Sequence, residues 1–165
     1  MPQMTPRPAQ WIESAPIKVR ASREMAATPD EVWVAVADHA GWPEWFTSIE
    51  RAEATGGSGV GSTRSVFIRS WRLDEEFVEW EAPALFGFTV VAADGPIGRL
   101  AESLNERIEI QVLASDRVRV TYLQGWQPRS RVTGLMLRGA ARRVGAQLRS
   151  ALSALEARIE AGRNV

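Results

Sequence analysis

The sequence predicts an α+β protein in which an antiparallel sheet of about seven strands is covered by one long C-terminal helix. Two periods in the hydrophobic pattern support this prediction. Over most of residues 17–126, apolar residues alternate with polar ones, as in strands that bury one face. Over residues 137–159 they recur at every third or fourth position, as in an amphipathic helix. Because a sheet with one apolar face needs a cover, we expect the helix to lie across that face.

The chain is expected to open with a strand that begins at Ile17 and is followed by two short helices. Thr28 can cap the first helix through its hydroxyl, and Pro29 suits the first helical position. Aspartate, glycine and proline within residues 38–43 then end this helix and begin the second. Strand, helix and helix are therefore the first three elements.

Six further strands are expected, mostly joined as hairpins. Glycine, proline, aspartate and serine mark the turns between them. Strands joined by short turns run antiparallel. We assign them to residues 48–55, 61–70, 73–80, 86–92, 103–113 and 117–126.

Length and composition indicate one domain. A chain of 165 residues with 45% hydrophobic composition is long enough for one core and short for two. Residues 1–12 contain several prolines and no apolar run, so we expect a flexible N-terminal tail followed by a single domain over residues 13–165. No segment has the apolar length of a membrane span, and no signal peptide is found.

The inventory of reactive side chains narrows the possible chemistry. The chain has no cysteine and one histidine, His39, so we expect no disulfide and no metal site, and we expect His39 at the surface or as a helix cap. The glycine cluster at residues 56–61 lacks the ending of a phosphate loop, and no cofactor is expected. Absence of cysteine fits a cytoplasmic protein.

Charge is balanced overall but uneven along the chain. Lys+Arg and Asp+Glu both number 20, so net charge does not select a partner. Between residues 117 and 149 every charged residue is arginine, which suits an anionic lipid surface or nucleic acid. Because aromatic residues are not interleaved, we do not expect nucleic acid. We favour a solvated helix face that pairs with the acidic run at residues 74–81.

Three motifs and the order of elements resemble the START-like (SRPBCC) helix-grip superfamily, and its polyketide cyclase/dehydrase branch in particular. The motifs are Pro29–Trp33, Trp42–Trp45 and Val78–Pro83, and the likeness covers residues 15–161. The resemblance implies a curved sheet wrapped around the C-terminal helix, with a cavity between them. It does not select an activity, because the superfamily includes carriers, receptors and cyclases.

Alternation along the strands predicts which side chains line this cavity. Small residues on the helix, such as Ala140, leave room above the sheet, although a solid core is the alternative. Trp71 lies in the turn between two strands, where members of the superfamily often have a loop that gates the pocket, so the resemblance implies a lid role for it. The predicted ligand-binding residues are Trp33, Val66, Ile68, Trp71, Val78, Trp80, Phe86, Phe88, Val90, Ile108, Ile110, Val120, Trp126, Met136, Ala140 and Val144.

The same alternation directs Arg64, Asp74, Glu76 and Glu106 into the interior. A buried carboxylate is costly unless it is paired or protonated, so a glutamate near Arg64 would be a candidate acid or base. The alternative is a bulge near Trp71, which would shift the register and place Asp74 and Glu76 in water. Glu106 would then be the remaining inward carboxyl, unless it lies at a solvated strand end.

Tyr122 is the only tyrosine and lies in the middle of a strand with its ring directed inward. Aromatase/cyclases of the superfamily use pocket arginine, tyrosine and tryptophan to steer an enolate, and the resemblance therefore implies such roles for Arg64, Tyr122 and Trp80. In an enzyme, Glu76 or Glu106 would move the proton. Packing with one satisfied hydroxyl is the simpler role for Tyr122.

Three functional hypotheses follow. The first, which we prefer, is a protein that binds a hydrophobic small molecule such as a lipid, a polyketide or an isoprenoid-like compound. The second is an enzyme, a polyketide cyclase/dehydratase-like lyase. The third is an interaction module whose arginine-rich helix docks a protein or a membrane, and this hypothesis predicts a filled interior. The sequence leaves open whether the protein is a monomer or a dimer.

Overall fold

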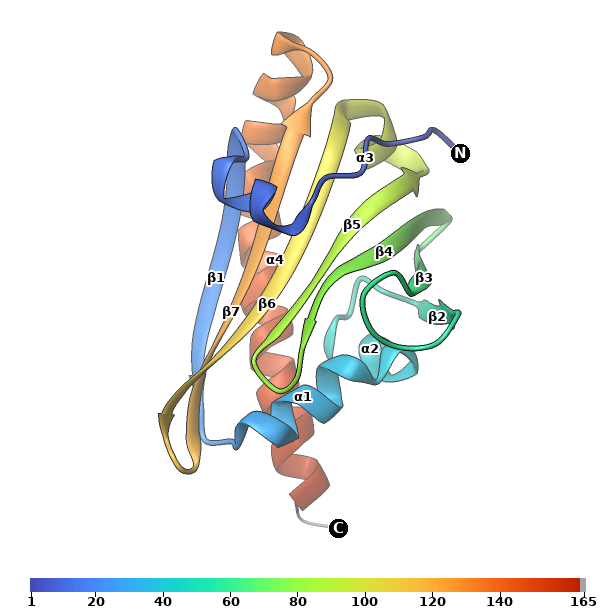
Figure 1. The fold of residues 1–165 in the computed structure, drawn as a ribbon. Helices are drawn as coiled ribbons and strands as arrows, with labels where there is room; N and C mark the ends of the chain where they lie inside the picture. The colour runs from blue at the N-terminus through green and yellow to red at the C-terminus, as the bar shows by residue number, and fades with distance from the viewer. Residues whose placement is uncertain (164–165) are drawn as a thin grey trace.

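A computed structural model describes residues 1–163. It shows a seven-stranded antiparallel sheet, in the order β1-β7-β6-β5-β4-β3-β2, that curves around the long helix α4 (Figure 1). The elements are the 3-10 helix η1 (Ala9–Ser14), β1 (Ile17–Met25), α1 (Pro29–Ala37), η2 (His39–Gly41), α2 (Trp42–Trp45), β2 (Arg51–Thr55), β3 (Thr63–Ile68), β4 (Trp71–Glu81), β5 (Leu85–Ala93), α3 (Gly95–Leu100), β6 (Ala101–Ala114), β7 (Arg117–Pro128) and α4 (Arg131–Arg163).

The predicted fold class is confirmed, and two helical elements, η1 and α3, are additional. The helix-grip arrangement, the seven strands, the two short helices after β1 and the long last helix are all present. Helix α3 occupies what was expected to be a turn, and α4 begins six residues before Leu137, at Arg131. Helices η1 and α3 were missed because a helix of six residues carries too little periodic signal.

The first helix begins as its sequence indicates. The hydroxyl of Thr28 accepts a hydrogen bond from the backbone N–H of Glu31 at 3.3 Å, and the Glu31 carboxylate accepts one from the backbone N–H of Thr28 at 2.7 Å. This reciprocal capping box satisfies two free N–H groups of the first turn. Asp38 then accepts from the backbone N–H of Gly41, which sets the corner where α2 begins. The corner places α2 against the inner side of the sheet.

Strand β4 contains the main departure from regular alternation. Its pairing with β5 shifts register between Asp74 and Glu75 and again between Phe77 and Glu79. As a result Leu73, Glu75 and Phe77 are buried, whereas Asp74 and Glu76 are only half-buried and lie outside the cavity described below.

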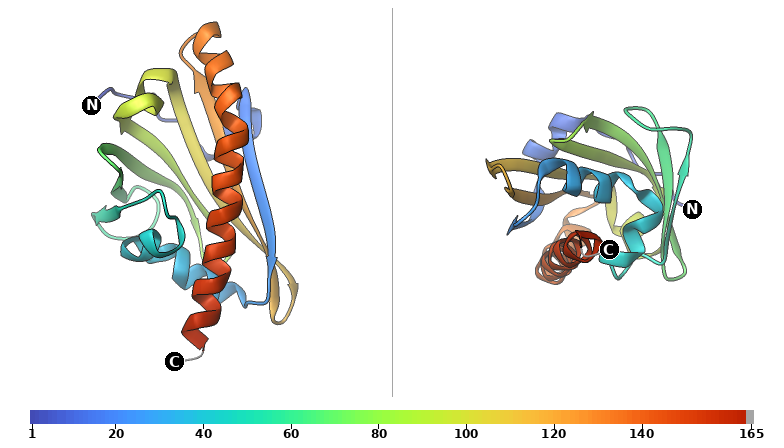
Figure 2. Two further views of the ribbon diagram at one scale, coloured as in Figure 1. Left: turned by 180° about the vertical axis from the view of Figure 1, so that it is seen from behind. Right: turned by 90° about the horizontal axis from the view of Figure 1, so that it is seen from below.

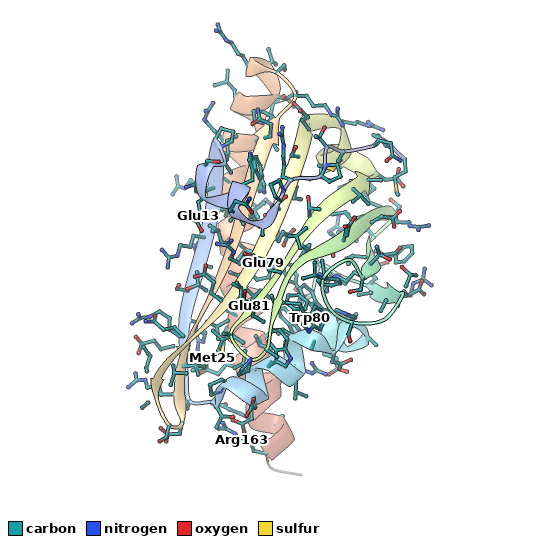
Figure 3. The ribbon with its side chains drawn as sticks, in the orientation of Figure 1. Glu13, Met25, Glu79, Trp80, Glu81 and Arg163 are labelled. Carbon is teal, nitrogen blue, oxygen red and sulfur yellow. The ribbon has the colours of Figure 1, made fainter. Side chains whose placement is uncertain are left out.

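The prediction that Asp74 and Glu76 project inward is therefore wrong. The extra residue between Phe77 and Glu79 reverses which side chains of the strand face inward. The predicted inward face is therefore correct at Trp80 and wrong for the residues before Val78. The alternative weighed above, a register shift, is the one observed, although it occurs within the strand rather than at Trp71. Figure 3 shows neighbouring Glu79 and Trp80 on the ribbon of β4.

The end of the sheet next to α1 is filled by aromatic side chains. The Trp33 ring lies 5.6 Å from that of Trp80 and 6.1 Å from that of Phe86, both edge-on. Phe77 lies 5.0 Å from Phe86 and 5.1 Å from Trp80. Edge-on and tilted contacts of this kind add to the burial of ring area. This end of the interior is consequently solid.

Helix α4 covers the sheet along one apolar stripe, as predicted (Figure 2). Leu148, Leu152 and Leu155 are fully buried on this stripe. The residues opposite them on the helix are exposed, as an amphipathic cover requires.

Residues 1–12 differ from the predicted loose tail. They lie along the outer face of the sheet, on the side away from α4 (Figure 1). Met4 is buried, its backbone N–H donates to the carbonyl of Val91 at 2.9 Å, and Thr5 donates to Glu102 at 2.8 Å. The proposed boundary at residue 13 falls inside η1, whose Ile12 is also buried. The segment therefore packs as part of the sheet's outer layer.

Among residues 1–163, none of the helices combines the length and the apolar character needed to cross a bilayer.

Burial along α4 leads to a test of the fold. Leu152→Ala should lower the free energy of unfolding by roughly 2–5 kcal/mol, because a fully buried leucine is replaced by a void. Leu135→Ala, at a position that is 70% exposed on the same helix, should change it by less than about 0.5 kcal/mol. Urea denaturation monitored by circular dichroism measures both. Equal losses would contradict the assignment of the buried stripe.

Candidate functional site

A cavity of about 290 Å³ lies between the inner face of the sheet and α4, and helices α2 and α3 form its remaining walls. Its lining is mostly apolar. Residues from β3, β4, β5, β6 and β7 contribute one wall, and Leu137, Ala140, Val144 and Gln147 of α4 contribute the opposite one. The space between sheet and helix is therefore filled by aromatic packing at the α1 end, and the cavity lies toward α3.

Seven of the sixteen predicted ligand-binding residues lie on this cavity. They come from four strands and from α4, and they include the candidate lid. These residues are Val66, Ile68, Trp71, Phe88, Trp126, Ala140 and Val144.

The other nine lie elsewhere. For most of those on strands, the reason is that alternation identifies the inward face of a strand but not which part of that face borders the cavity. Most belong to the filled core, Val78 is half-buried off the cavity, and Met136 is 56% exposed on α4. These residues are Trp33, Val78, Trp80, Phe86, Val90, Ile108, Ile110, Val120 and Met136.

Several lining residues were not predicted. Helix α3 contributes Pro96, Ile97 and Leu100, and its existence was missed altogether. Helix α2 contributes Trp42, whose indole N–H donates to the carbonyl of Val36 at 2.8 Å. The motif around Trp42 was used to identify the fold, but only the tertiary structure shows that its ring walls the cavity.

Trp71 lies where the cavity lining reaches the protein surface. It is 38% exposed and lines the cavity, and its indole lies against Gly95 at the start of α3. A Cβ atom built on Gly95 would lie 2.6 Å from the indole, and the backbone of this glycine has a φ of +67°. Glycine suits this position because any side chain would clash with the indole and because a positive φ is unfavourable for other residues. The lid role of Trp71 remains a prediction.

Arg64 is the central polar group of the cavity. Its side chain is completely buried, and its Nε donates to Oε2 of Glu75 at 2.5 Å. The guanidinium carbon lies 3.8 Å from the centre of the Trp42 ring and 4.5 Å from that of Phe88, so aromatic faces cover the charge. Its Nη2 is buried and has no hydrogen-bond partner among residues 1–163.

Glu75 takes the position that was predicted for Glu76. Burial raises the pKa of the Glu75 carboxyl, and the neighbouring Arg64 guanidinium opposes this effect. The ion pair joins β3 to β4 inside the protein. An arginine–glutamate pair was expected here, but with Glu76, the residue that follows Glu75 in the strand.

Glu106 lies on the same cavity wall and is also buried. The hydroxyl of Tyr122 donates to its Oε2 at 2.5 Å. Burial, followed by the negative charge of Glu75, raises the pKa of Glu106 to about 7. Burial, together with the Glu106 carboxylate, raises the pKa of Tyr122 well above its usual value. Near neutral pH, Glu106 can therefore hold or release a proton whereas Tyr122 remains a donor.

Gln124 lies beside this pair, and its Oε1 accepts a hydrogen bond from the indole N–H of Trp126 at 3.1 Å. Of the four predicted catalytic candidates, the structure thus brings Arg64, Glu106 and Tyr122 to one cavity and leaves out Glu76. Together with Glu75, these residues give the cavity two carboxyl groups and one guanidinium, and burial raises the pKa of both carboxyl groups.

His39 is neither at the surface nor the residue that caps the corner. It is half-buried, stacks on Phe77 with ring centres 5.1 Å apart, and its Nδ1 lies 3.4 Å from Nη1 of Arg64. Burial, and then the positive charge of Arg64, lower the pKa of His39 to about 4. Its imidazole is therefore neutral at pH 7 and can accept from the guanidinium.

The predicted pairing of α4 arginines with the acidic run 74–81 is not observed. Asp74 pairs with Arg72, Glu75 with Arg64, and Glu79 with Arg107. These partners lie within the sheet, which is closer to the acidic residues than the outer face of α4. Over the described residues, no cluster of histidine, cysteine, aspartate and glutamate could hold a metal ion.

Comparison with known proteins identifies the class. Residues 16–160 match the family model described as polyketide cyclase / dehydrase and lipid transport, so the chain belongs to this family. Uncharacterized proteins of Mycobacterium tuberculosis and Mycobacterium bovis are each 38% identical to it over 74 residues. That match covers 43% of this chain and 44% of each relative, which is less than half of their length.

Solved structures confirm the fold. A START superfamily protein of Mycobacterium smegmatis superposes with a TM-score of 0.71 at 18% identity, over 87% of this chain and 97% of that one. A protein of Thermus thermophilus gives 0.71 at 20% identity, over 88% and 99%. DynU16, a protein in the dynemicin biosynthetic locus, gives 0.66 at 17% identity, over 88% and 48%. At such identities the likeness concerns architecture alone.

The raised pKa of Glu106 predicts a pH dependence of stability. The folded protein binds more protons at this residue than the unfolded chain between pH 4.5 and about 7, so its contribution to the free energy of unfolding falls as pH rises through this interval. His39 acts in the opposite sense, because its pKa is lowered from 6.5 to about 4.

The difference between wild type and Glu106→Gln isolates the first effect, since both proteins retain His39. Relative to Glu106→Gln, we expect wild-type stability to fall from pH 4.5 to about 7, as measured by urea unfolding at a series of pH values. A difference that stays constant with pH would contradict the assignment.

Proposed function

We propose that this protein binds a compact hydrophobic molecule whose oxygen-bearing end accepts a hydrogen bond from Arg64. The observation that carries the proposal is the buried Nη2 of Arg64, which has no hydrogen-bond partner among residues 1–163 although Arg64 lines the mostly apolar cavity. Leaving a charged donor buried and unpaired is unfavourable, so a ligand oxygen at this point would gain a charge-assisted hydrogen bond.

The rest of the cavity supports an apolar ligand body. Rings and aliphatic side chains line it, and burial of apolar surface against them supplies binding free energy without directional contacts. A volume of about 290 Å³ lies near the lower end of the range of about 300–1,000 Å³ that is usual for small-molecule sites. We therefore favour a molecule with a few rings or a short isoprenoid or polyketide chain over a whole phospholipid.

A second candidate function is a proton-transfer enzyme of the cyclase/dehydratase type. The observation that favours it is Glu106, a cavity carboxyl whose pKa is raised to about 7 and which is hydrogen-bonded to Tyr122. A general acid or base works best when its pKa lies near the working pH. Arg64 would then stabilise an enolate oxygen, and Tyr122 would hold the carboxyl in place.

The third hypothesis, an interaction module, predicted a filled interior, and the cavity argues against that prediction. The cavity favours ligand binding as the primary function, and the exposed face of α4 is considered separately below.

A cavity-filling substitution tests the binding site. Ala140→Trp should weaken binding of 2-naphthol by at least roughly tenfold, because the indole would occupy the space between α4 and the sheet. Ala146→Trp is the matched control, since Ala146 is also an exposed alanine of α4 but does not line the cavity. Isothermal titration calorimetry measures both, and equal affinities would contradict the proposed site.

The role of Arg64 is tested with a ligand pair of similar shape, 2-naphthol and 2-methylnaphthalene. Wild type should prefer the phenol, and the double variant Arg64→Met/Glu75→Leu should lose about tenfold of this preference, since a hydrogen bond to a charged group is removed. The double change avoids leaving Glu75 buried without its partner. Retained preference would show that the ligand oxygen does not meet Arg64.

The enzyme hypothesis is tested by turnover. If Glu106 transfers a proton, Glu106→Gln should lower the rate of cyclisation or dehydration of a polyketide substrate by roughly 10²-fold or more while binding is kept. Glu76→Gln, at the position that lies off the cavity, should leave the rate unchanged. Binding without turnover in wild type would favour a carrier.

A further inference from the structure

The first turns of α4 present an apolar surface to solvent. Val132 is 69% exposed, Leu135 is 70% exposed and Met136 is 56% exposed. Residues three and four apart are neighbours on a helix, so these side chains form one continuous patch, which we call the α4 apolar triplet. Single exposed apolar residues are ordinary on a protein surface, but a continuous group on one helix face indicates a contact surface.

The same stretch of α4 carries positive charge that the described residues do not neutralise. No carboxylate occurs between Asp116 and Glu156 in the sequence. The α4 arginines of this stretch are exposed, and none forms an ion pair within residues 1–163. They are Arg131, Arg138, Arg142, Arg143 and Arg149. By contrast, Arg158 and Arg163 near the other end of α4 pair with acidic residues.

This surface adjoins two elements that line the cavity, α3 and the middle of α4. Helix α3 and the first turns of α4 lie at the same end of the molecule, opposite the C-terminus (Figures 1 and 2). Arg129 joins the two, because its backbone N–H donates to the carbonyl of Leu100 at 3.0 Å and its Nε to that of Gly98 at 3.1 Å. Met136 lies one helical turn before Ala140, which lines the cavity.

We propose that the α4 apolar triplet and its arginines dock this end of the protein on an anionic lipid bilayer. The triplet would enter the interface between headgroups and acyl chains, and the arginines would contact lipid phosphates. The surface is a convex helix face rather than a groove, which suits a deformable bilayer better than a peptide or a single-stranded nucleic acid that needs a stacking platform. The proposal does not depend on what the cavity holds.

A single-site fluorescence experiment tests the location of the contact. The chain has no cysteine, so Leu135→Cys and Val34→Cys can each carry one environment-sensitive fluorophore. Val34 is 69% exposed on α1, near the opposite end of the molecule, and is the matched control. With vesicles of phosphatidylcholine and phosphatidylglycerol, the emission at position 135 should shift to the blue and rise, whereas that at position 34 should not change.

Affinity variants test the two physical components. In vesicle co-sedimentation, Leu135→Asp and Arg142→Glu should each weaken binding by about tenfold or more, because each removes a favourable interaction and adds a repelled charge. Val34→Asp and Arg20→Glu, at exposed sites on α1 and β1, should bind like wild type. High salt should weaken wild-type binding, since screening acts on the arginines.

Three results would overturn the proposal: no binding to anionic vesicles, equal binding to vesicles of phosphatidylcholine alone, or equal losses in the α4 variants and their controls. The ligand-binding variant Arg64→Met/Glu75→Leu should still bind vesicles, because its substitutions are buried far from the helix surface. Failure of the docking proposal is thereby distinguishable from failure of the proposed ligand-binding function.

Discussion

The buried charge of Arg64 is the constraint on which much of this interior depends. A guanidinium in an apolar core is costly unless other groups compensate it, and here each compensating group comes from a different element. Glu75 supplies the counter-charge from β4, Trp42 supplies an aromatic face from α2, and His39 supplies a neutral acceptor from the corner after α1. The same contacts that make the charge tolerable join the helical corner to the sheet and leave one nitrogen, Nη2, without a partner.

The two ends of the interior show how side-chain size decides between core and cavity. Near α1, the rings of Trp33, Phe77, Trp80 and Phe86 fill the space between the sheet and the helices. Toward α3, the α4 side of the cavity is lined by Leu137, Ala140, Val144 and Gln147, and the small side chain of Ala140 leaves part of this space unfilled.

Electrostatics link the cavity to both candidate functions. One guanidinium faces two carboxyl groups, and burial keeps Glu106 close to half-protonated near neutral pH. A site of this kind can match either an anionic or a neutral oxygen by changing the protonation of Glu106. That property serves a binding protein that accepts related ligands, and it equally serves a proton-transfer enzyme. On the exposed face of α4, the arginines between Arg131 and Arg149 form no ion pair among the described residues, whereas Arg158 and Arg163 near the end of the helix are paired with acidic residues.

Local sequence alone determined the fold class, the capping box at Thr28, the antiparallel sheet and the covering helix, because hydrophobic period, caps and turns are properties of neighbouring residues. It also predicted that Arg64, Glu106 and Tyr122 face the interior, because the strand segments that carry them alternate regularly. The tertiary structure decided what depends on contacts between distant segments. The register shift between Phe77 and Glu79 of β4 exchanges Glu76 for Glu75, the six-residue helix α3 adds a wall to the cavity, and aromatic packing limits the cavity to one end. A register shift of one residue, or side chains that fill a space between elements, does not change the hydrophobic pattern of the sequence. Such features can therefore be seen only in the assembled tertiary structure.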